Sequence, residues 1–195
     1  MADENLKKFL SEIQMLKRVR HEGVTHAGVS SPDSIAEHIV IASQIAYVLA
    51  KMEGANAERA ATLCLFHENG EIRVGDGTWV SARYLNTKDA ENKAEKEHYS
   101  NLPKSISDDI MKLVDEKNER KTPEGIIARD ADKLELAIQC KIYVEQGYSG
   151  CNTWIKNIEG LLTTSSAKKI YEEIKNEPDM TNLWWQGLKK NPDNK

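Results

Sequence analysis

Apolar residues recur at intervals of three and four along most of the chain, and no two segments alternate in the way that paired strands do. The first segment with this spacing, residues 4–20, predicts an amphipathic helix. The same spacing predicts further helices. Two of them begin near Ser34 and Pro103, and the others cover about 57–69, 79–86, 88–100, 124–146 and 164–176. The pattern therefore predicts an all-α protein.

Polar segments separate the predicted helices. Residues 20–34 form a loop that is rich in hydrogen-bond donors and suited to holding an anion, and residues 115–125 form a second polar loop. We expect the end of the chain, residues 188–195, to be loose. We expect three tryptophans to cover the edge of the core rather than to form a cofactor site: Trp154, Trp184 and Trp185.

Two histidines stand at positions where the pattern requires core residues. His38 lies in the apolar stripe of the helix that begins at Ser34, and His67 lies in the apolar face of the helix predicted over 57–69. A single buried histidine is most often a core residue with one hydrogen-bond partner. Two histidines on adjacent antiparallel helices can meet, however, and a shared metal ion would satisfy both in their neutral form.

The sequence LCLFHENGEIRVGD, residues 63–76, gathers groups that bind metals or transfer protons. His67 and Glu71 are four residues apart, so in a helix they share one face. Glu68 lies about 100° round the helix from His67, and Asp76 follows after a short glycine-containing segment. Such groups are costly to bury without a use. The stretch therefore indicates half of a hydrolytic metal site.

The helix predicted over 124–146 is apolar on two sides, which is typical of a central helix. It carries Asp130 and Asp132, whose side chains point about 200° apart. Both cannot enter one site, and the periodicity does not choose between them. In the structural alternative, either aspartate pairs with Arg129 or Lys133.

Imidazoles combined with carboxylates suit one divalent transition metal ion, such as Zn, Mn, Co, Ni or Fe. Such an ion lowers the pKa of a bound water and polarises a phosphoryl oxygen. Glu71, one turn beyond His67, could then give or accept a proton. Glu91 or Glu95, on the charged and mostly solvated helix over 88–100, could also approach the site.

Composition narrows the class of protein. The chain has 195 residues, of which 39% are hydrophobic and 30% charged, as expected for one soluble domain. Its net charge of −4 does not favour a broad nucleic-acid surface. We find no export signal and no apolar run that approaches the roughly 20 residues of a membrane span. Together with an odd number of cysteines, this predicts a cytoplasmic protein without membrane or nucleic-acid partners.

Three motifs carry a resemblance to a known family. In their order and spacing, SPDSIAEH, FHENGEIRVGD and ARDADKLELAIQ resemble the HD-domain phosphohydrolases, and most closely their 5′-deoxynucleotidase branch, which also has an early Arg-containing loop like LKRVRHEGV. The resemblance covers about residues 5–145 and, more loosely, the helices and tail over 150–195. It implies a single all-helical HD domain over 1–195, often present as a homodimer.

The resemblance also assigns roles to residues. It implies that the metal ligands are His38, His67, Glu68 and Asp132, which selects Asp132 over Asp130. It implies Glu71 as the catalytic carboxylate, Asp76 as a substrate-pocket residue, and Arg18 or Arg20 as the phosphate-binding residue. Three positions depart from the family pattern. Glu68 replaces the usual aspartate, Val24 replaces an aromatic residue that often follows the early arginine, and His21 stands near where the phosphate-binding arginine is expected.

Three functions remain open at this point. The first is hydrolysis of (deoxy)nucleoside 5′-monophosphates to nucleoside and phosphate. The second keeps the fold and metal but acts on another nucleotide or phosphate ester. The third is a non-catalytic helical module that the metal stabilises. Glu71 favours the catalytic functions, because a purely structural metal site needs no further carboxyl group beside its ligands.

Overall fold

The computed structural model describes residues 4–188, and within this range all regular secondary structure is helical. The predicted all-α class is therefore confirmed. The α-helices are α1 (Glu4–Glu12), α2 (Ile35–Glu53), α3 (Ala57–Leu65), α4 (Glu71–Val74), α5 (Thr87–Tyr99), α6 (Lys104–Glu119), α7 (Pro123–Glu145), α8 (Asn152–Glu159), α9 (Ser165–Asn176) and α10 (Met180–Gln186). Short 3-10 helices are η1 (Ile13–Lys17), η2 (Glu22–Ala27), η3 (Ser81–Arg83) and η4 (Ser149–Cys151).

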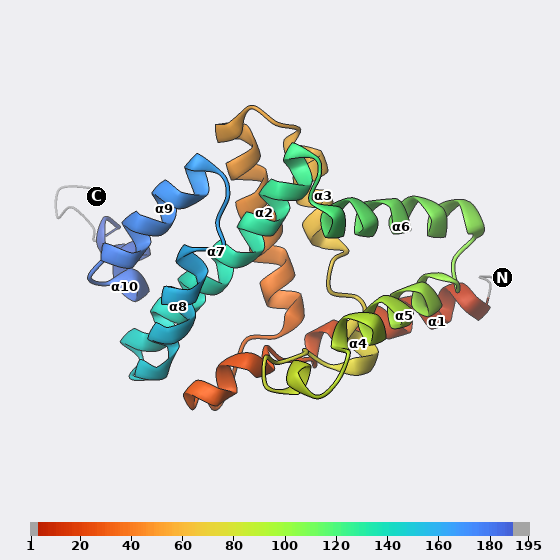
Figure 1. Cartoon of the computed structure of the whole chain (residues 1–195), viewed down its shortest axis with the longest axis horizontal. Helices are drawn as coiled ribbons and strands as arrows, with labels where there is room; N and C mark the ends of the chain where they lie inside the picture. Colours follow the sequence, from red (N-terminus) through yellow and green to blue (C-terminus); the bar gives the residue numbers. More distant parts are fainter. Residues whose placement is uncertain (1–3, 189–195) are drawn as a thin grey trace, which may run out of the picture.

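Helix α7 is the centre of the bundle, as its two apolar sides predict. It packs against α2 and α3 on one side and against α8 and α9 on the other, while α6 leads into it (Figure 1). Small residues at these crossings let the helices approach closely, and several are fully buried: Ala42, Ala46, Ala60, Ala128 and Ala131. The side chain of Thr122 caps α7 and Pro123 occupies its first turn, so the chain begins this helix sharply.

Helix α2 corrects one expectation from composition. Residues Ile35–Glu53 are long and apolar enough to cross a membrane by length and hydropathy alone. The core helix of a folded domain passes the same test, and the inner face of α2 is buried against α3 and α7. The helix begins with the predicted capping box, in which Ser34 and Glu37 satisfy each other's backbone amides.

A smaller apolar cluster lies between α1, α5 and α6, at the right of Figure 1. Tyr99 is fully buried in it and packs near Phe9. Beside this cluster, Arg73 of α4 pairs with Glu12 of α1 and with Glu97 of α5. Helix α4, which begins with Glu71, is therefore fixed to two neighbouring helices through its arginine.

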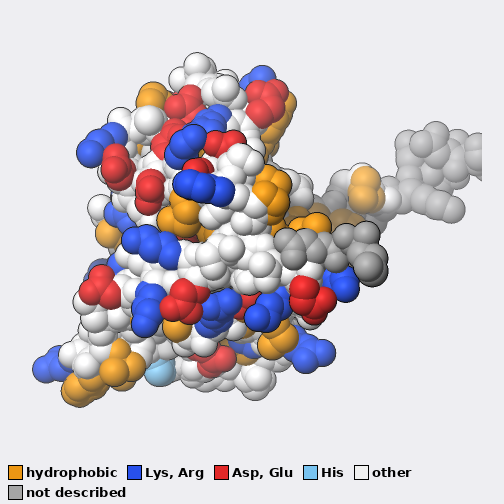
Figure 2. Space-filling view, turned by 90° about the vertical axis from the view of Figure 1, so that its right-hand side faces the viewer, with side chains coloured by type: hydrophobic (Ala, Val, Ile, Leu, Met, Phe, Trp, Pro, Cys, Tyr) orange, Lys and Arg blue, Asp and Glu red, His pale blue; other side chains and the backbone are white. Residues whose placement is uncertain are grey.

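The surface seen in Figure 2 carries Lys and Arg side chains interspersed with Asp and Glu side chains. No broad field of one sign forms on this face. The mixture agrees with the small net charge of −4.

Several predicted boundaries were wrong. The first helix continues only as the 3-10 turn η1 to Lys17, the helix expected over 79–86 is reduced to the 3-10 turn η3, and α6 extends to Glu119 into the expected polar loop. The helix expected over 57–69 ends at Leu65, because the His67 ring bonds to the Cys64 carbonyl and competes with a further helical turn. The expectation for residues 189–195 falls outside the described residues.

Asp130 has a structural role. Its carboxylate is fully buried and accepts hydrogen bonds from the backbone amides of Thr163 and Thr164 and from the Thr164 hydroxyl. Thr164 is also the residue that caps α9. Asp130 thus holds the start of α9 against α7. It lies on the side of α7 away from Asp132, as their predicted angular separation requires.

We expect the substitution Asp130→Ala to lower the free energy of unfolding by about 3 kcal/mol, because it removes a charged acceptor from two backbone amides and a hydroxyl. Chemical denaturation followed by circular dichroism measures this change. An unchanged midpoint would show that the contact with α9 contributes nothing to stability.

Candidate active site

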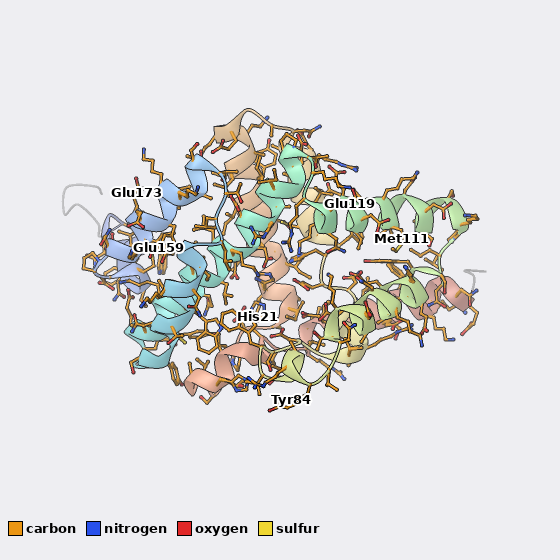
Figure 3. All side chains as sticks on the ribbon, in the orientation of Figure 1. His21, Tyr84, Met111, Glu119, Glu159 and Glu173 are labelled. Atoms are coloured by element: carbon orange, nitrogen blue, oxygen red, sulfur yellow. The ribbon has the colours of Figure 1, made fainter. Side chains whose placement is uncertain are left out.

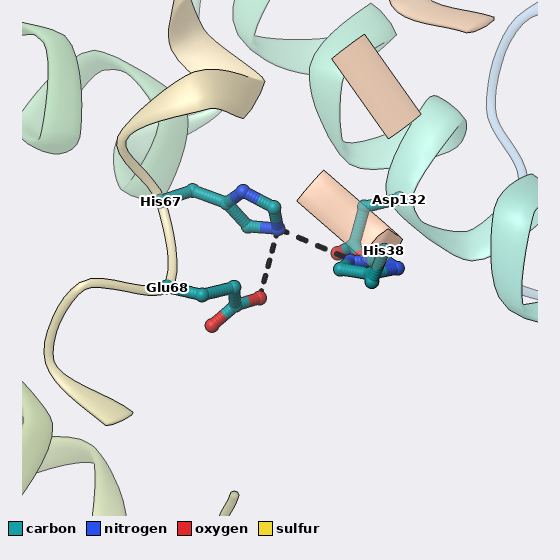
Figure 4. A group of neighbouring side chains, drawn as sticks. All are labelled: His38, His67, Glu68 and Asp132. Carbon is teal, nitrogen blue, oxygen red and sulfur yellow. Dashed lines mark ion pairs between the residues drawn. The ribbon is translucent and has the colours of Figure 1, made fainter. Parts of the chain in front are cut away.

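Four side chains converge where α2, α3 and α7 meet (Figure 4). Each of His38, His67, Glu68 and Asp132 offers one ligand atom, and these atoms all lie within 4.8 Å of one another. The Nε2 atom of His67 is 2.8 Å from a Glu68 oxygen, and the Nε2 atom of His38 is 3.5 Å from an Asp132 oxygen. The structure therefore brings together all four residues that the resemblance implies as metal ligands.

Three separate elements supply these residues. His38 comes from the buried face of α2 and Asp132 from α7, whereas His67 and Glu68 lie in the turn after α3. The expectation that His67 and Glu71 share one helical face was wrong, because Glu71 is the first residue of α4. Closely spaced turns over residues 66–70, rather than a helix, bring the two side chains to the same cavity.

Neighbouring acceptors fix both imidazoles in the same tautomer. The Nδ1 atom of His38 is 2.6 Å from a carboxylate oxygen of Glu135, and the Nδ1 atom of His67 bonds to the Cys64 carbonyl. Both Nδ1 atoms must therefore donate a proton. In the neutral rings, each Nε2 atom then presents a lone pair to the cluster, which is the arrangement that metal-binding histidines adopt.

The donor set fits a divalent cation. The Nε2 atoms of His38 and His67 are buried, and among residues 4–188 neither makes a contact with the geometry of a hydrogen bond, although oxygens of Asp132 and Glu68 lie 3.5 and 2.8 Å away. Burial opposes a charge on His38, but contacts with Asp132 and Glu135 outweigh it and raise the pKa of this imidazole to about 10. The pocket thus strongly favours positive charge at His38, and a cation bound to the neutral ring would supply that charge in place of the proton.

A second group of possible ligands, His21, His38 and Glu135, adjoins the first. It shares His38 with the first group, and the contact of the His38 Nδ1 atom with Glu135 already uses two of its atoms. The rings of His21 and His38 are 4.5 Å apart, and His21 lies 3.3 Å from Asp33. We therefore interpret this group as the surroundings of His38, which orient its ring.

Glu71 is buried in a cavity that also contains Glu68, Asp76 and Glu91. Burial is the largest cause of its altered acidity, and repulsion from the other three carboxylates adds to it, so that the pKa of Glu71 rises to about 11. Asp76 lies in the wall of the same cavity and accepts a hydrogen bond of 3.3 Å from the Gly23 amide. The cluster therefore contains one carboxyl group that keeps its proton near neutral pH.

The cavity has a volume of about 480 Å³, within the range of small-molecule sites. Lysines from two helices approach its metal-ligand end. Lys117 of α6 and Lys133 of α7 lie 3.8 and 3.3 Å from the same oxygen of Asp132. Attraction by Asp132 raises the pKa of Lys133, so its ammonium group stays charged. The cavity also receives Lys88 and Arg120.

The expected phosphate-binding arginines lie elsewhere. Arg18 and Arg20 are exposed and are absent from the lining of this cavity, and Arg20 contacts Glu37 at 3.8 Å and the Pro32 carbonyl. A phosphate contact by either residue stays a prediction. The early loop instead contributes His21, Gly23, Val24 and His26 to the lining of the cavity, and Figure 3 labels His21.

Sequence reasoning missed several residues of the site. Lys117 was assigned to a polar loop and Trp154 to the edge of the core, whereas both line the cavity. Glu135 could have been recognised, because it follows Asp132 by three positions and therefore shares its helical face. Lys117 gave no comparable signal, since its approach depends on how α6 packs against α7.

Comparison with known proteins agrees with this geometry. A family model described as the HD domain matches residues 13–175. The chain belongs to the HD-domain family. A 5′-deoxynucleotidase HDDC2 of Danio rerio is 26% identical over 146 residues, which cover 73% of this chain and 71% of the relative. The HDDC2 protein of Homo sapiens, also named a 5′-deoxynucleotidase, is 25% identical over 71% of this chain and 68% of its own length.

Solved structures share the fold. A conserved hypothetical protein from Pyrococcus furiosus superimposes with a TM-score of 0.73 at 27% identity, over 87% of this chain and 99% of the other. A predicted coding region of Archaeoglobus fulgidus gives a TM-score of 0.63 at 27% identity, over 94% of this chain and all of the other. The resemblance to the HD-domain 5′-deoxynucleotidases is therefore confirmed at the level of family and fold.

We expect Asp132→Ala to remove most of the bound metal, because the cluster loses the carboxylate that faces His38. Metal content after reconstitution and desalting, measured by mass spectrometry, tests this. Asp130→Ala is the matched control, since it makes the same change two positions away on the same helix and should retain metal while it lowers stability. Equal metal loss in both variants would contradict the assignment of Asp132.

Proposed function

We propose that this protein is a metal-dependent phosphomonoesterase that hydrolyses (deoxy)nucleoside 5′-monophosphates to nucleoside and phosphate. One observation carries the proposal: two histidines and two carboxylates converge in a cavity that also contains the buried Glu71 and two lysines. The names of the relatives from Danio rerio and Homo sapiens support the nucleotide substrate.

The proposed metal site consists of His38, His67, Glu68 and Asp132. A divalent cation held there supplies an acidic water and a positive charge beside the phosphate. The contribution of Glu135 is to hold the His38 ring, and the contribution of the Cys64 carbonyl is to hold the His67 ring, so that both Nε2 atoms keep their direction when the site is empty.

Two lysines are placed to bind the phosphate. Lys117 and Lys133 lie beside the same oxygen of Asp132, and both line the cavity. Ammonium groups at this position attract a phosphate dianion and hold its oxygens next to the metal ligands. In our proposal they take the role that the resemblance gave to Arg18 or Arg20.

Glu71 provides the proton. Hydrolysis forms a bond from the oxygen of water to phosphorus and breaks the bond from phosphorus to the nucleoside 5′-oxygen, which needs a proton as it leaves. Because the pKa of Glu71 is raised to about 11, its carboxyl group carries that proton at neutral pH. The proton released by the attacking water restores the acid. Asp76 accepts a hydrogen bond from the Gly23 amide, and its negative charge helps to keep the pKa of Glu71 high.

A panel of phosphate esters tests the function directly. After chelator treatment, the protein is assayed for phosphate release with Mn, Co, Ni, Zn or Mg. We expect turnover of deoxynucleoside 5′-monophosphates with at least one transition metal and little with nucleoside triphosphates or cyclic nucleotides. Release from triphosphates alone would support a different nucleotide hydrolase. No release from any ester would contradict the proposal.

We expect Glu71→Gln to lower kcat by about 10²- to 10⁴-fold while bound metal is retained, because the amide keeps the shape of the side chain but cannot give its proton to the leaving oxygen. Steady-state kinetics and metal content on the same sample measure both effects. Glu91→Gln is the comparison, since it removes another carboxyl group of the cavity and should cost much less. Unchanged turnover in Glu71→Gln would refute the assigned role.

A further inference from the structure

Two tryptophans that are not metal ligands form part of the cavity wall. Trp79 comes from the loop between α4 and η3, and Trp154 comes from α8. Their rings are nearly parallel, with an interplanar angle of 10° and centroids 6.2 Å apart. Both rings line the cavity that contains His67 and Asp132. We call Trp79 and Trp154 the indole wall.

Trp154 is held in place by its surroundings. It is partly buried on α8, and its Nε1 atom lies near Gly23, where a Cβ atom would be only 3.8 Å away. The amide of Gly23 in turn donates to Asp76, which lies three residues before Trp79. One short chain of contacts therefore links α8, η2 and the loop that carries Trp79, so the two rings are presented to the cavity by connected backbone.

The high exposure of Trp79 does not contribute to the stability of the fold. Its side chain is 65% exposed, although an indole gains more from burial than almost any other side chain. It stands parallel to Trp154, and Val80, which also lines the cavity, is 55% exposed beside it. Sites that bind a flat aromatic group present this kind of exposed, flat apolar surface to a cavity.

The rest of this wall is also apolar. Besides the two indoles, the cavity is lined by Val24, Leu136, Ile158 and Leu161, and Ile158 follows Trp154 by four residues, so the two share one face of α8. The cavity thus combines the charged residues of the metal-ligand cluster with an apolar, aromatic surface. A nucleoside monophosphate has a matching combination, because its phosphate is charged and its base is flat, aromatic and neutral.

We propose that the indole wall binds the nucleobase by stacking, and so makes the enzyme select nucleotides over sugar phosphates that lack a base. This inference rests on the proposed function, since it places the phosphate of the same substrate at the metal ligands. Every base presents an aromatic face, so stacking tolerates all four bases and favours the larger purines. The selectivity is therefore for the presence of a base rather than for its identity.

The test compares two substrates that differ in the base. 2′-Deoxyadenosine 5′-monophosphate and 2-deoxyribose 5-phosphate are hydrolysed by wild-type protein and by the variants W79A, W154A and W79F. We expect W79A and W154A to lower kcat/KM for the nucleotide by about tenfold or more, mainly through KM, with little change for the sugar phosphate. W79F, which keeps an aromatic face, should recover most of the loss.

W184A is the matched control. Trp184 is a similarly exposed indole on α10, is 75% exposed and does not line the cavity, so its removal should leave both substrates unaffected. Equal losses on both substrates in W79A would overturn the stacking role, and so would no loss on the nucleotide. A change of oligomeric state in W79A without a change in base selectivity would assign the exposed ring to contact with a second copy, and would also overturn it.

Calorimetric binding separates this inference from the proposed function. If wild-type protein hydrolyses neither substrate, binding of 2′-deoxyadenosine 5′-monophosphate is measured directly. Binding that weakens about tenfold or more in W79A and W154A, but not in W184A, supports the indole wall although the hydrolytic function has failed. Binding that is equal in all four proteins, or absent in the wild type, overturns the indole wall.

Discussion

The buried Nε2 atoms of His38 and His67 are the constraint on which the rest of the site depends. Both histidines donate from Nδ1 to fixed acceptors, Glu135 and the Cys64 carbonyl, so neither ring can turn its Nε2 atom elsewhere. Buried nitrogen atoms without a partner are costly. The two Nε2 atoms come from different elements but lie close together, and the carboxylates of Glu68 and Asp132 lie beside them. A cation removes the cost at all four positions together.

Helix α7 shows how one segment serves both the fold and the site. Asp130 and Asp132 are two residues apart, and the helix sends them to different sides. Asp130 is satisfied by amides and a hydroxyl at the start of α9, where its charge is compensated by hydrogen bonds. Asp132 instead faces histidines and lysines, where its charge is available to a ligand. The surroundings, rather than residue type, divide the two roles.

The sequence was most informative where periodicity and chemistry coincide. His38 sits in an apolar stripe whose helix begins at a capping box, and local rules are sufficient to predict both. The turn that carries His67 was misread as helix, because its ending depends on a hydrogen bond from the His67 ring itself. The approach of Lys117, and the pairing of Trp79 with Trp154, depend on packing between distant segments. No pattern within one segment could have predicted them.

The negative charge of the cavity has two effects that support each other. Glu68 and Asp132 give a cation its ligands, while Glu68, together with Asp76 and Glu91, also makes ionisation of Glu71 unfavourable. A cavity with fewer carboxylates would hold a cation less well and would raise the pKa of Glu71 less, although burial, the largest cause of the shift, would remain. Lys117 and Lys133 add positive charge at one point of this cavity, because they lie 3.8 and 3.3 Å from the same oxygen of Asp132. In the proposed function, the carboxylates of the cavity therefore hold the cation, and these two ammonium groups offset the remaining negative charge where a phosphate would bind.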